Sequence, residues 1–192
     1  MMMVMSLPLT AKTLHLTKAN TLILQGRIDG DSALAVLKSY EQKCKNGNDL
    51  YLILDTPGGE VYTSYVLVTT LNAGKCTVHS VTLEAASAGF IIAQMLDGKR
   101  YMVKSGMMMV HGMSGTMGVN LNTSAAELEF MQKTLYDETV RGLRSICKRR
   151  SKIDCDDLIA NIKLDRFFLA DQSLERGFVD AIVEIAKAED DE

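Results

Sequence analysis

The sequence predicts an α/β protein built around a largely parallel sheet. Short apolar runs alternate with stretches of helical periodicity along the whole chain. One of these runs, residues 50–54 (LYLIL), is apolar at every position, which is typical of parallel strands that are covered on both faces. The 192 residues are 47% apolar and 23% charged, a composition that predicts one folded domain over residues 1–192.

Local signals predict the elements of the first half of the chain in order. Asp31 is the expected N-cap of a helix that runs to Lys45, with Leu34, Leu37 and Tyr40 on one face. Asn46-Gly47 and Pro57-Gly58-Gly59 interrupt regular structure. Between these signals we expect strands at 21–25, 50–54 and 76–83 and helices at 31–45 and 61–73.

The second half continues the alternation and contains one unusually long helix. Ser124 and Glu127 form a capping box, and apolar spacing continues to about Lys148. About 25 helical residues span roughly 37 Å, so this helix is expected to project beyond the domain. The remaining expected elements are helices at 85–95, 154–161 and 171–176 and strands at 100–103, 107–110 and 181–185.

Charge and cysteine usage exclude several classes of function. The net charge of −3 argues against a nucleic-acid-binding surface, and the basic run Lys148–Arg150 is interpreted as the cationic last turn of the long helix. No apolar stretch is long enough to span a membrane, and the first five residues lack the layout of a secretory signal. The acidic residues 187–192 are expected to form a solvated tail.

The four cysteines form no C-x-x-C pair, so we expect neither a zinc motif nor a redox motif. We also expect no metal site elsewhere and no cofactor. Cys76 and Cys147 lie in apolar segments and are interpreted as buried free thiols. Free thiols would indicate a reducing compartment.

The segment Glu84-Ala-Ala-Ser87-Ala-Gly89 is a candidate for nucleophilic catalysis. Small residues surround the Ser87 hydroxyl, and a helix that begins there would direct free N–H groups toward developing negative charge. A serine that merely caps a helix would give the same local pattern. The segment alone leaves both interpretations open.

Asp55-Thr-Pro-Gly58-Gly59 follows a predicted buried strand and could supply donors for an oxyanion. Two glycines permit backbone conformations closed to other residues and expose their N–H groups. One such N–H, with that of Ala88, could form an oxyanion hole. An ordinary strand-to-helix turn is the alternative.

His111 is the best candidate for a general base among three histidines. It ends a short apolar strand beside Gly112, where the imidazole would be accessible, and its usual pKa suits proton transfer at neutral pH. His15 has no nucleophile nearby in sequence, and His79 alternates with apolar residues inside a strand, which indicates a structural role.

Together these segments resemble the proteolytic subunits of the Clp ATP-dependent protease. DTPGG (55–59), EAASAG (84–89), MMMVHG (107–112), DRF (165–167) and ERGFVD (175–180) occur in the family's order between about Leu22 and Val183. The resemblance implies Ser87 as nucleophile, His111 as base and Asp165 as the acid that orients it. It also implies an oxyanion hole formed by Gly59 and Ala88, with Gly58 shaping the turn.

The resemblance also implies a fold and an assembly. The fold would be a crotonase-like spiral of β-β-α units with a protruding handle helix, here residues 123–150. Two seven-membered rings would stack through these helices into a tetradecamer that cleaves peptides or unfolded proteins in the bacterial cytoplasm, or in the host cytoplasm if the protein is encoded by a phage. An ATP-dependent unfoldase would deliver substrates, although residues 1–20 match the family poorly, which weakens that expectation.

Several alternatives remain at the level of sequence. Gly112-Met113 replace the family's usual Gln-Pro, and Glu84 occupies a position that is commonly Gln or Gly. The chain could be a non-catalytic subunit of a mixed ring, a phage head-maturation protease or a crotonase-type acyl-CoA enzyme. A Ser–Lys peptidase would use Lys99 or Lys104 as its base instead of His111.

Overall fold

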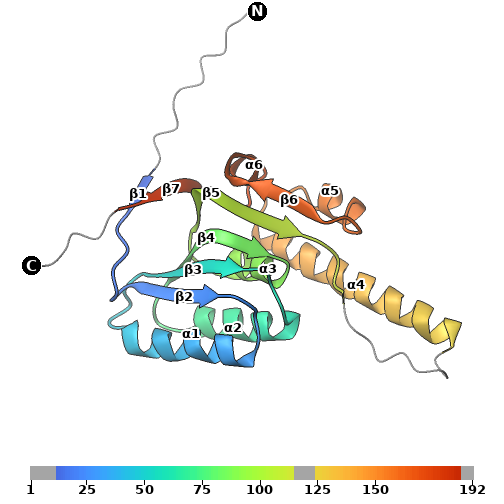
Figure 1. The fold of residues 1–192 in the computed structure, drawn as a ribbon, viewed down its shortest axis with the longest axis horizontal. Coiled ribbons are helices and arrows are strands. Elements are labelled where there is room, and N and C mark those ends of the chain that lie inside the picture. The colour runs from blue at the N-terminus through green and yellow to red at the C-terminus, as the bar shows by residue number, and fades with distance from the viewer. Residues whose placement is uncertain (1–11, 115–123, 187–192) are drawn as a thin grey trace, which may run out of the picture.

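The computed structural model describes residues 12–114 and 124–186, and the expected acidic tail and most of the divergent N-terminal segment lie outside these ranges. Within these ranges, seven strands form one sheet with the order β1-β7-β5-β4-β3-β2, in which β6 pairs with β5 and is the one antiparallel strand (Figure 1). The prediction of an α/β fold with a largely parallel sheet is confirmed. The strands are β1 (Lys12–Leu14), β2 (Thr21–Gln25), β3 (Leu50–Thr56), β4 (Val78–Ala86), β5 (Arg100–Val110), β6 (Arg166–Leu169) and β7 (Ala181–Ile185).

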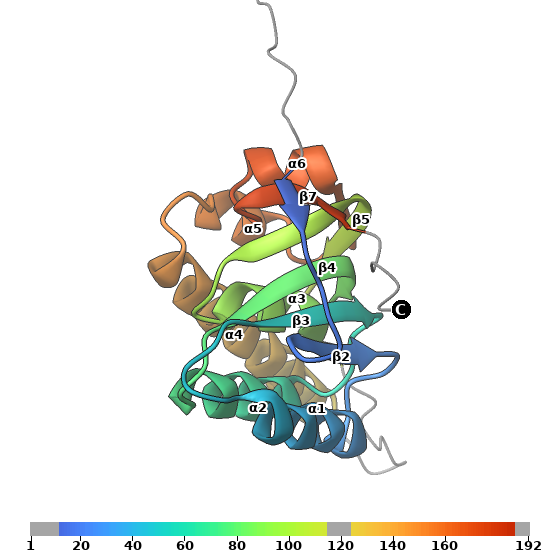
Figure 2. The same ribbon diagram turned by 90° about the vertical axis from the view of Figure 1, so that its left-hand side faces the viewer.

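The helices lie mostly on one side of this sheet. Figure 2 shows α1 and α2 packed together along the side of β2 and β3. The core cluster on this side combines helix residues such as Val36 and Leu67 with strand residues such as Leu22 and Leu52. The helices are α1 (Gly30–Lys43), α2 (Val61–Ala73), α3 (Ala88–Met95), α4 (Ala125–Arg149), α5 (Cys155–Ala160) and α6 (Ala170–Glu175).

The first helix begins earlier than predicted. Asp29, not Asp31, is the N-cap of α1, because its carboxylate accepts a hydrogen bond from the Ser32 N–H while the Ser32 hydroxyl accepts one from the Asp29 N–H. Val36 and Tyr40 are buried and Leu37 packs against the core, whereas Leu34 is exposed. The predicted face is therefore confirmed at Leu37 and Tyr40 and wrong at Leu34.

The two short strands predicted at 100–103 and 107–110 are the two halves of β5, and each half pairs with a different strand that follows later in the chain. The first half pairs with β7 and the second with β6. The register with β4 shifts between Thr82 and Glu84, where β5 contains additional residues. Gly106 lies in this irregularity, and a Cβ there would come within 2.8 Å of the Thr82 carbonyl oxygen. Strands β1 and β6 were missed because each is too short to show periodicity.

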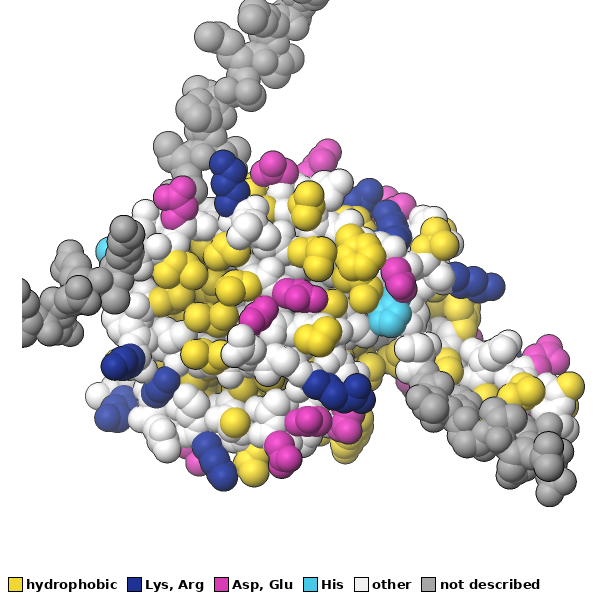
Figure 3. All heavy atoms as spheres, viewed as in Figure 1, with side chains coloured by type: hydrophobic (Ala, Val, Ile, Leu, Met, Phe, Trp, Pro, Cys, Tyr) yellow, Lys and Arg dark blue, Asp and Glu magenta, His cyan; other side chains and the backbone are white. Residues whose placement is uncertain are grey.

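The prediction that strand 50–54 is covered on both faces is wrong. Leu50, Leu52 and Leu54 are buried against the helices, whereas Tyr51 and Ile53 point to the opposite face and are only partly buried. Hydrophobic side chains gather on that second face of the sheet (Figure 3), where Ile23 on the neighbouring strand is 60% exposed. An apolar run predicts a strand, but the helices of this chain cover only one of its faces.

The cysteine prediction is also wrong, because the four cysteines form two disulfides, Cys44–Cys76 and Cys147–Cys155. Sequence spacing could not reveal the first pair, since 32 residues separate its members while their Cα atoms lie 5.6 Å apart. The argument for a reducing compartment, which rested on free thiols, therefore loses its basis.

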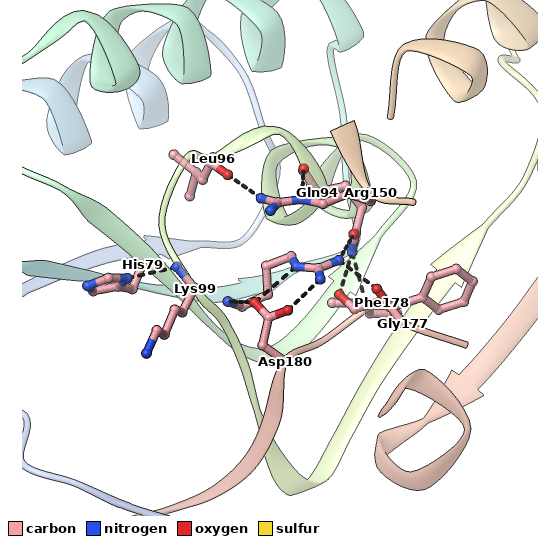
Figure 4. Close-up of polar contacts among 10 residues, drawn as sticks. His79, Gln94, Leu96, Lys99, Arg150, Gly177, Phe178 and Asp180 are labelled. Carbon is pink, nitrogen blue, oxygen red and sulfur yellow. Dashed lines mark hydrogen bonds and ion pairs between the residues drawn. The ribbon is translucent and has the colours of Figure 1, made fainter. Parts of the chain in front are cut away.

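A buried polar network connects the residues just before β7 with the start of β5, the strand beside β7 in the sheet. The Arg100 side chain is almost fully buried and donates hydrogen bonds to the Gln94 side chain, the Gly177 carbonyl and the Asp180 carboxylate (Figure 4). Arg150, at the end of α4, donates in turn to the carbonyls of Gln94 and Leu96 at the end of α3. The expected cationic end of the long helix is therefore present and caps a neighbouring helix.

The long helix α4 begins at the predicted capping box of Ser124 and Glu127 and extends away from the domain (Figure 1). Its buried residues, Thr139, Leu143 and Ile146, all lie in its C-terminal half. In the N-terminal half, the side chain of Phe130 is 71% exposed. Within residues 12–114 and 124–186, no helix is both long and apolar enough to cross a bilayer.

Candidate active site

Ser87 lies at the junction between β4 and α3 in a backbone conformation that few residues adopt. The strand continues through Ala86, three residues beyond its predicted end, and the helix begins at Ala88, so the junction is sharper than the sequence indicated. The Ser87 φ angle is +54°, in a region that residues with a side chain rarely occupy. Its side chain forms no capping hydrogen bond to α3, which removes the simple N-cap interpretation. Strain at one non-glycine residue is frequently found at functional sites.

His111 is positioned by the strand next to that of Ser87. It follows Val110 at the end of β5, and β5 pairs with β4 in parallel, so both residues emerge from the same edge of the sheet. The Ser87 N–H donates to the Met109 carbonyl at 2.9 Å, and this hydrogen bond fixes the end of β4 beside the end of β5. The His111 Nε2 atom lies 2.7 Å from the Ser87 Oγ atom, which is hydrogen-bonding distance.

Asp165 reaches the same imidazole from the antiparallel strand β6. Arg166 pairs with Val110 in the β5–β6 register, so the residues just outside this pair, Asp165 and His111, face each other. The Asp165 Oδ1 atom lies 3.5 Å from the His111 Nδ1 atom. This contact is longer than an ordinary hydrogen bond, and the Asp165 side chain is 66% exposed.

The glycine pair lies directly against the nucleophile. Gly58 and Gly59 have φ angles of +98° and +153°, which only glycine adopts readily, and a Cβ on Gly58 would come within 2.7 Å of the Ser87 Cβ. The Gly58 N–H donates to the Thr56 hydroxyl, so Gly58 shapes the turn and its amide is already bonded. Ile28 and Gly59 form an isolated β-bridge. Its two hydrogen bonds run from the Ile28 N–H to the Gly58 carbonyl and from the Glu60 N–H to the Ile28 carbonyl, so the Gly59 N–H takes no part in the bridge.

A pocket opens beside the Ser87 hydroxyl. Its walls come from α2, α3 and the buried half of α4, and they combine apolar side chains such as Phe90 and Leu143 with polar ones such as Thr139. Tyr65 adds a phenol whose pKa is raised by burial and by the nearby Glu138, so the phenol is neutral at physiological pH. A pocket of mixed lining next to a nucleophile is suited to hold one side chain of a substrate.

The structure therefore brings together Ser87 and His111, which residue chemistry selected, and Asp165, which only the family resemblance implied. Sequence reasoning missed two supporting residues: Thr56, which holds the Gly58 amide, and Thr139 of α4, which accepts a hydrogen bond from the Met113 N–H beside His111. Neither has a local signal, since both are hydroxyl residues in regular elements. His79 is buried between Tyr51 and Tyr101, in agreement with the structural role predicted for it.

Comparison with known proteins identifies similar chains. The Clp protease family model matches residues 10–186. The ATP-dependent Clp protease proteolytic subunit of Streptococcus agalactiae serotype V is 30% identical over 175 residues, which cover 88% of this chain and 87% of that protein. The protein of the same name from Lactococcus lactis subsp. lactis is 28% identical over 174 residues, with 88% and 86% covered.

Proposed function

Because this chain belongs to the Clp protease family, we propose that it is a serine endopeptidase in which Ser87 is the nucleophile and His111 the general base. The observation that carries the proposal is the 2.7 Å contact between the Ser87 Oγ and His111 Nε2 atoms at the ends of two adjacent strands. A nucleophile and base in direct hydrogen-bond contact are what acyl transfer by serine requires.

In the proposed reaction, His111 accepts one proton and then returns it, once when the acyl-enzyme forms and once when it is hydrolysed. As the Ser87 oxygen bonds to the peptide carbonyl carbon, its proton passes to His111 Nε2, and the carbonyl π electrons move onto oxygen. When the C–N bond breaks, His111 returns the proton to the leaving amine, which leaves an acyl-enzyme ester. Water then attacks the ester, losing a proton to His111, and the Ser87 oxygen takes this proton back as the acid product leaves. Asp165 would orient the imidazole and stabilise its charged form.

The Gly59 and Ala88 N–H groups are the proposed donors to the tetrahedral oxyanion. Gly59 lines the pocket at Ser87, and Ala88 is the first residue of α3, whose N-terminal N–H groups have no partner within the helix. Removing one oxyanion donor typically costs about 100- to 1,000-fold in turnover.

Assembly into rings is a further part of the proposal. The exposed N-terminal half of α4 includes Leu128, Phe130 and Tyr136, which a second copy of the chain could cover. We propose that copies of the chain stack through this half of α4 into two rings of seven. The relatives' names include "ATP-dependent", which supports the proposal that a partner which hydrolyses ATP delivers substrates to this chain.

A fluorophosphonate probe tests the catalytic proposal directly. The parent chain should be labelled at Ser87 and should cleave an unfolded protein such as casein. The variant S87A should lose both activities and keep its thermal stability, whereas S145A, which changes an exposed serine on α4, should behave as the parent. Absence of labelling in the assembled parent would contradict the proposal and favour a non-catalytic ring subunit.

Further variants distinguish the alternative enzymes. H111A should abolish peptide cleavage, whereas K99M and K104M should retain it, and the reverse result would indicate a Ser–Lys peptidase. Thioester turnover that survives S87A would indicate a crotonase-type enzyme. F130S should lower the native mass with little change in the fold, because this side chain contacts the domain little, and an unchanged mass would contradict stacking through α4.

A further inference from the structure

The position of Asp165 depends on its backbone, because its carboxylate has little support of its own. The side chain is mostly exposed, and its contact with His111 is 3.5 Å long. An exposed carboxylate with one weak contact samples several rotamers unless the segment that carries it is rigid. The place of the Asp165 carboxylate therefore depends on the contacts that hold residues 161–166.

One carboxylate, that of Asp157 on α5, receives hydrogen bonds from both ends of that segment. Its Oδ1 atom accepts from the Asn161 amide at 3.2 Å, and its Oδ2 atom accepts from the Arg166 guanidinium at 2.9 Å. The Asp157 carbonyl accepts from the same two side chains. Both ends of the loop that carries Asp165 are thus hydrogen-bonded to the same residue, Asp157.

A second arginine strengthens this arrangement. Arg176, at the end of α6, donates to the same Asp157 Oδ2 atom at 2.8 Å. Both guanidinium groups lie 5.2 Å from the ring centre of Phe168, and this ring packs edge-on against the buried Phe178. The hydrogen bond from Arg166, supported by Arg176, lowers the pKa of Asp157, so the carboxylate stays charged at neutral pH.

The same loop is tied to the base. The Gly112 N–H, directly after His111, donates to the Ile162 carbonyl at 2.8 Å. The loops that carry His111 and Asp165 are therefore connected by one backbone hydrogen bond and by the β5–β6 pairing. A change in the conformation of residues 161–166 would alter the distance between imidazole and carboxylate.

We propose that Asp157, with Asn161, Arg166 and Arg176, forms a clamp that positions Asp165 against His111 and so sets the rate of the serine peptidase reaction. This inference rests on the proposed function. Asp157 is a positioning residue and lines neither of the pockets that contain His111. Its substitution should therefore act on turnover and leave substrate binding unchanged.

The variant D157N tests the clamp, with D156N as its matched control. Asp156 is the preceding residue of the same helix, is exposed, and undergoes the same change in charge. D157N should lower kcat by about 10- to 100-fold with KM unchanged, since misplacement of a catalytic group by about 1 Å can cost about 100-fold. The acid limb of the kcat/KM profile should move to lower pH, because a displaced carboxylate no longer stabilises the imidazolium. D156N should change none of these quantities.

A double-mutant cycle with D165N separates positioning from general damage. If the clamp acts through Asp165, D157N should cost less than about 2-fold in a D165N background. An equal loss in both backgrounds, or no difference between D157N and D156N, would overturn the clamp. If D157N does not fold, R166M serves instead, since methionine keeps most of the apolar stem but donates neither of the two hydrogen bonds to Asp157.

One measurement keeps the clamp separate from the proposed function. If S87A is as active as the parent, the proposed function fails whatever the clamp does. The pKa of the His111 imidazole, followed by NMR without turnover, should still be lower in D157N than in D156N. An identical His111 pKa in the two variants would overturn the clamp even in an inactive protein.

Discussion

Replacement of Arg100 by methionine should destabilise the fold strongly, although Arg100 is not one of the proposed catalytic residues. Only 5% of the arginine is exposed, and its guanidinium satisfies the Gln94 side chain, the Gly177 carbonyl and the Asp180 carboxylate. Methionine retains most of the apolar stem and donates no hydrogen bond. The variant therefore leaves the Gln94 side-chain oxygen and the Gly177 carbonyl without their donor. The Asp180 carboxylate loses the guanidinium but keeps the hydrogen bond from the backbone N–H of residue 100.

The size of the effect follows from those three groups. Removing one partner of a buried ion pair typically costs about 3–5 kcal/mol. The Asp180 side chain is 39% exposed, so water recovers part of its solvation and the lower end applies. We expect a loss of about 3 kcal/mol in the free energy of unfolding, which corresponds to about 6–12 °C in Tm for a chain of this size.

Denaturant unfolding followed by circular dichroism measures this loss, and two protein concentrations separate it from dissociation of an assembly. R144M is the control, since Arg144 is exposed on α4 and its replacement should cost less than about 0.5 kcal/mol. The double variant R100M/D180N should lose less than the sum of its single variants, because it removes both charges. A loss below about 1 kcal/mol in R100M would refute the importance assigned to this network.

Three further predictions follow from other parts of the structure. G58A should reduce the rate of fluorophosphonate labelling by at least about 10-fold, because its Cβ would displace the turn that lies against Ser87; an unchanged rate would contradict the close packing. C44S/C76S should lower the free energy of unfolding in oxidising buffer by about 4 kcal/mol, because the disulfide restricts a loop of 32 residues in the unfolded chain. If all four cysteines of the unfolded, unreduced parent can be alkylated, the disulfides are contradicted. Burial opposes ionisation of Asp180, but the hydrogen bonds from Arg100 outweigh it and lower its pKa below the ordinary 3.8. The contribution of the Asp180 carboxylate to the free energy of unfolding is therefore complete above pH 3.8 and is lost as the pH falls through the lowered pKa. The free energy of unfolding, measured between about pH 5 and 2, should therefore decline less in D180N than in the parent.

Sequence alone determined the features that depend on neighbours in the chain. The strand at 21–25, the helix at 61–73 and the capping box at Ser124 follow from local periodicity and side-chain to backbone bonding, and the structure reproduces them. Residue chemistry also selected Ser87 and His111 as a candidate pair. Asp165 entered only through resemblance to a family, because nothing in its local sequence distinguishes it from a turn carboxylate.

Tertiary structure alone decided the features that depend on strand register and on which faces are covered. The β5–β6 register places Asp165 opposite His111, and 54 residues of chain separate them, so no local pattern encodes their proximity. The same holds for Cys44 and Cys76, and for Ile23, whose exposure depends on which side of the sheet the helices occupy. Periodicity specifies which residues share a face, but only packing of the whole chain specifies what that face meets.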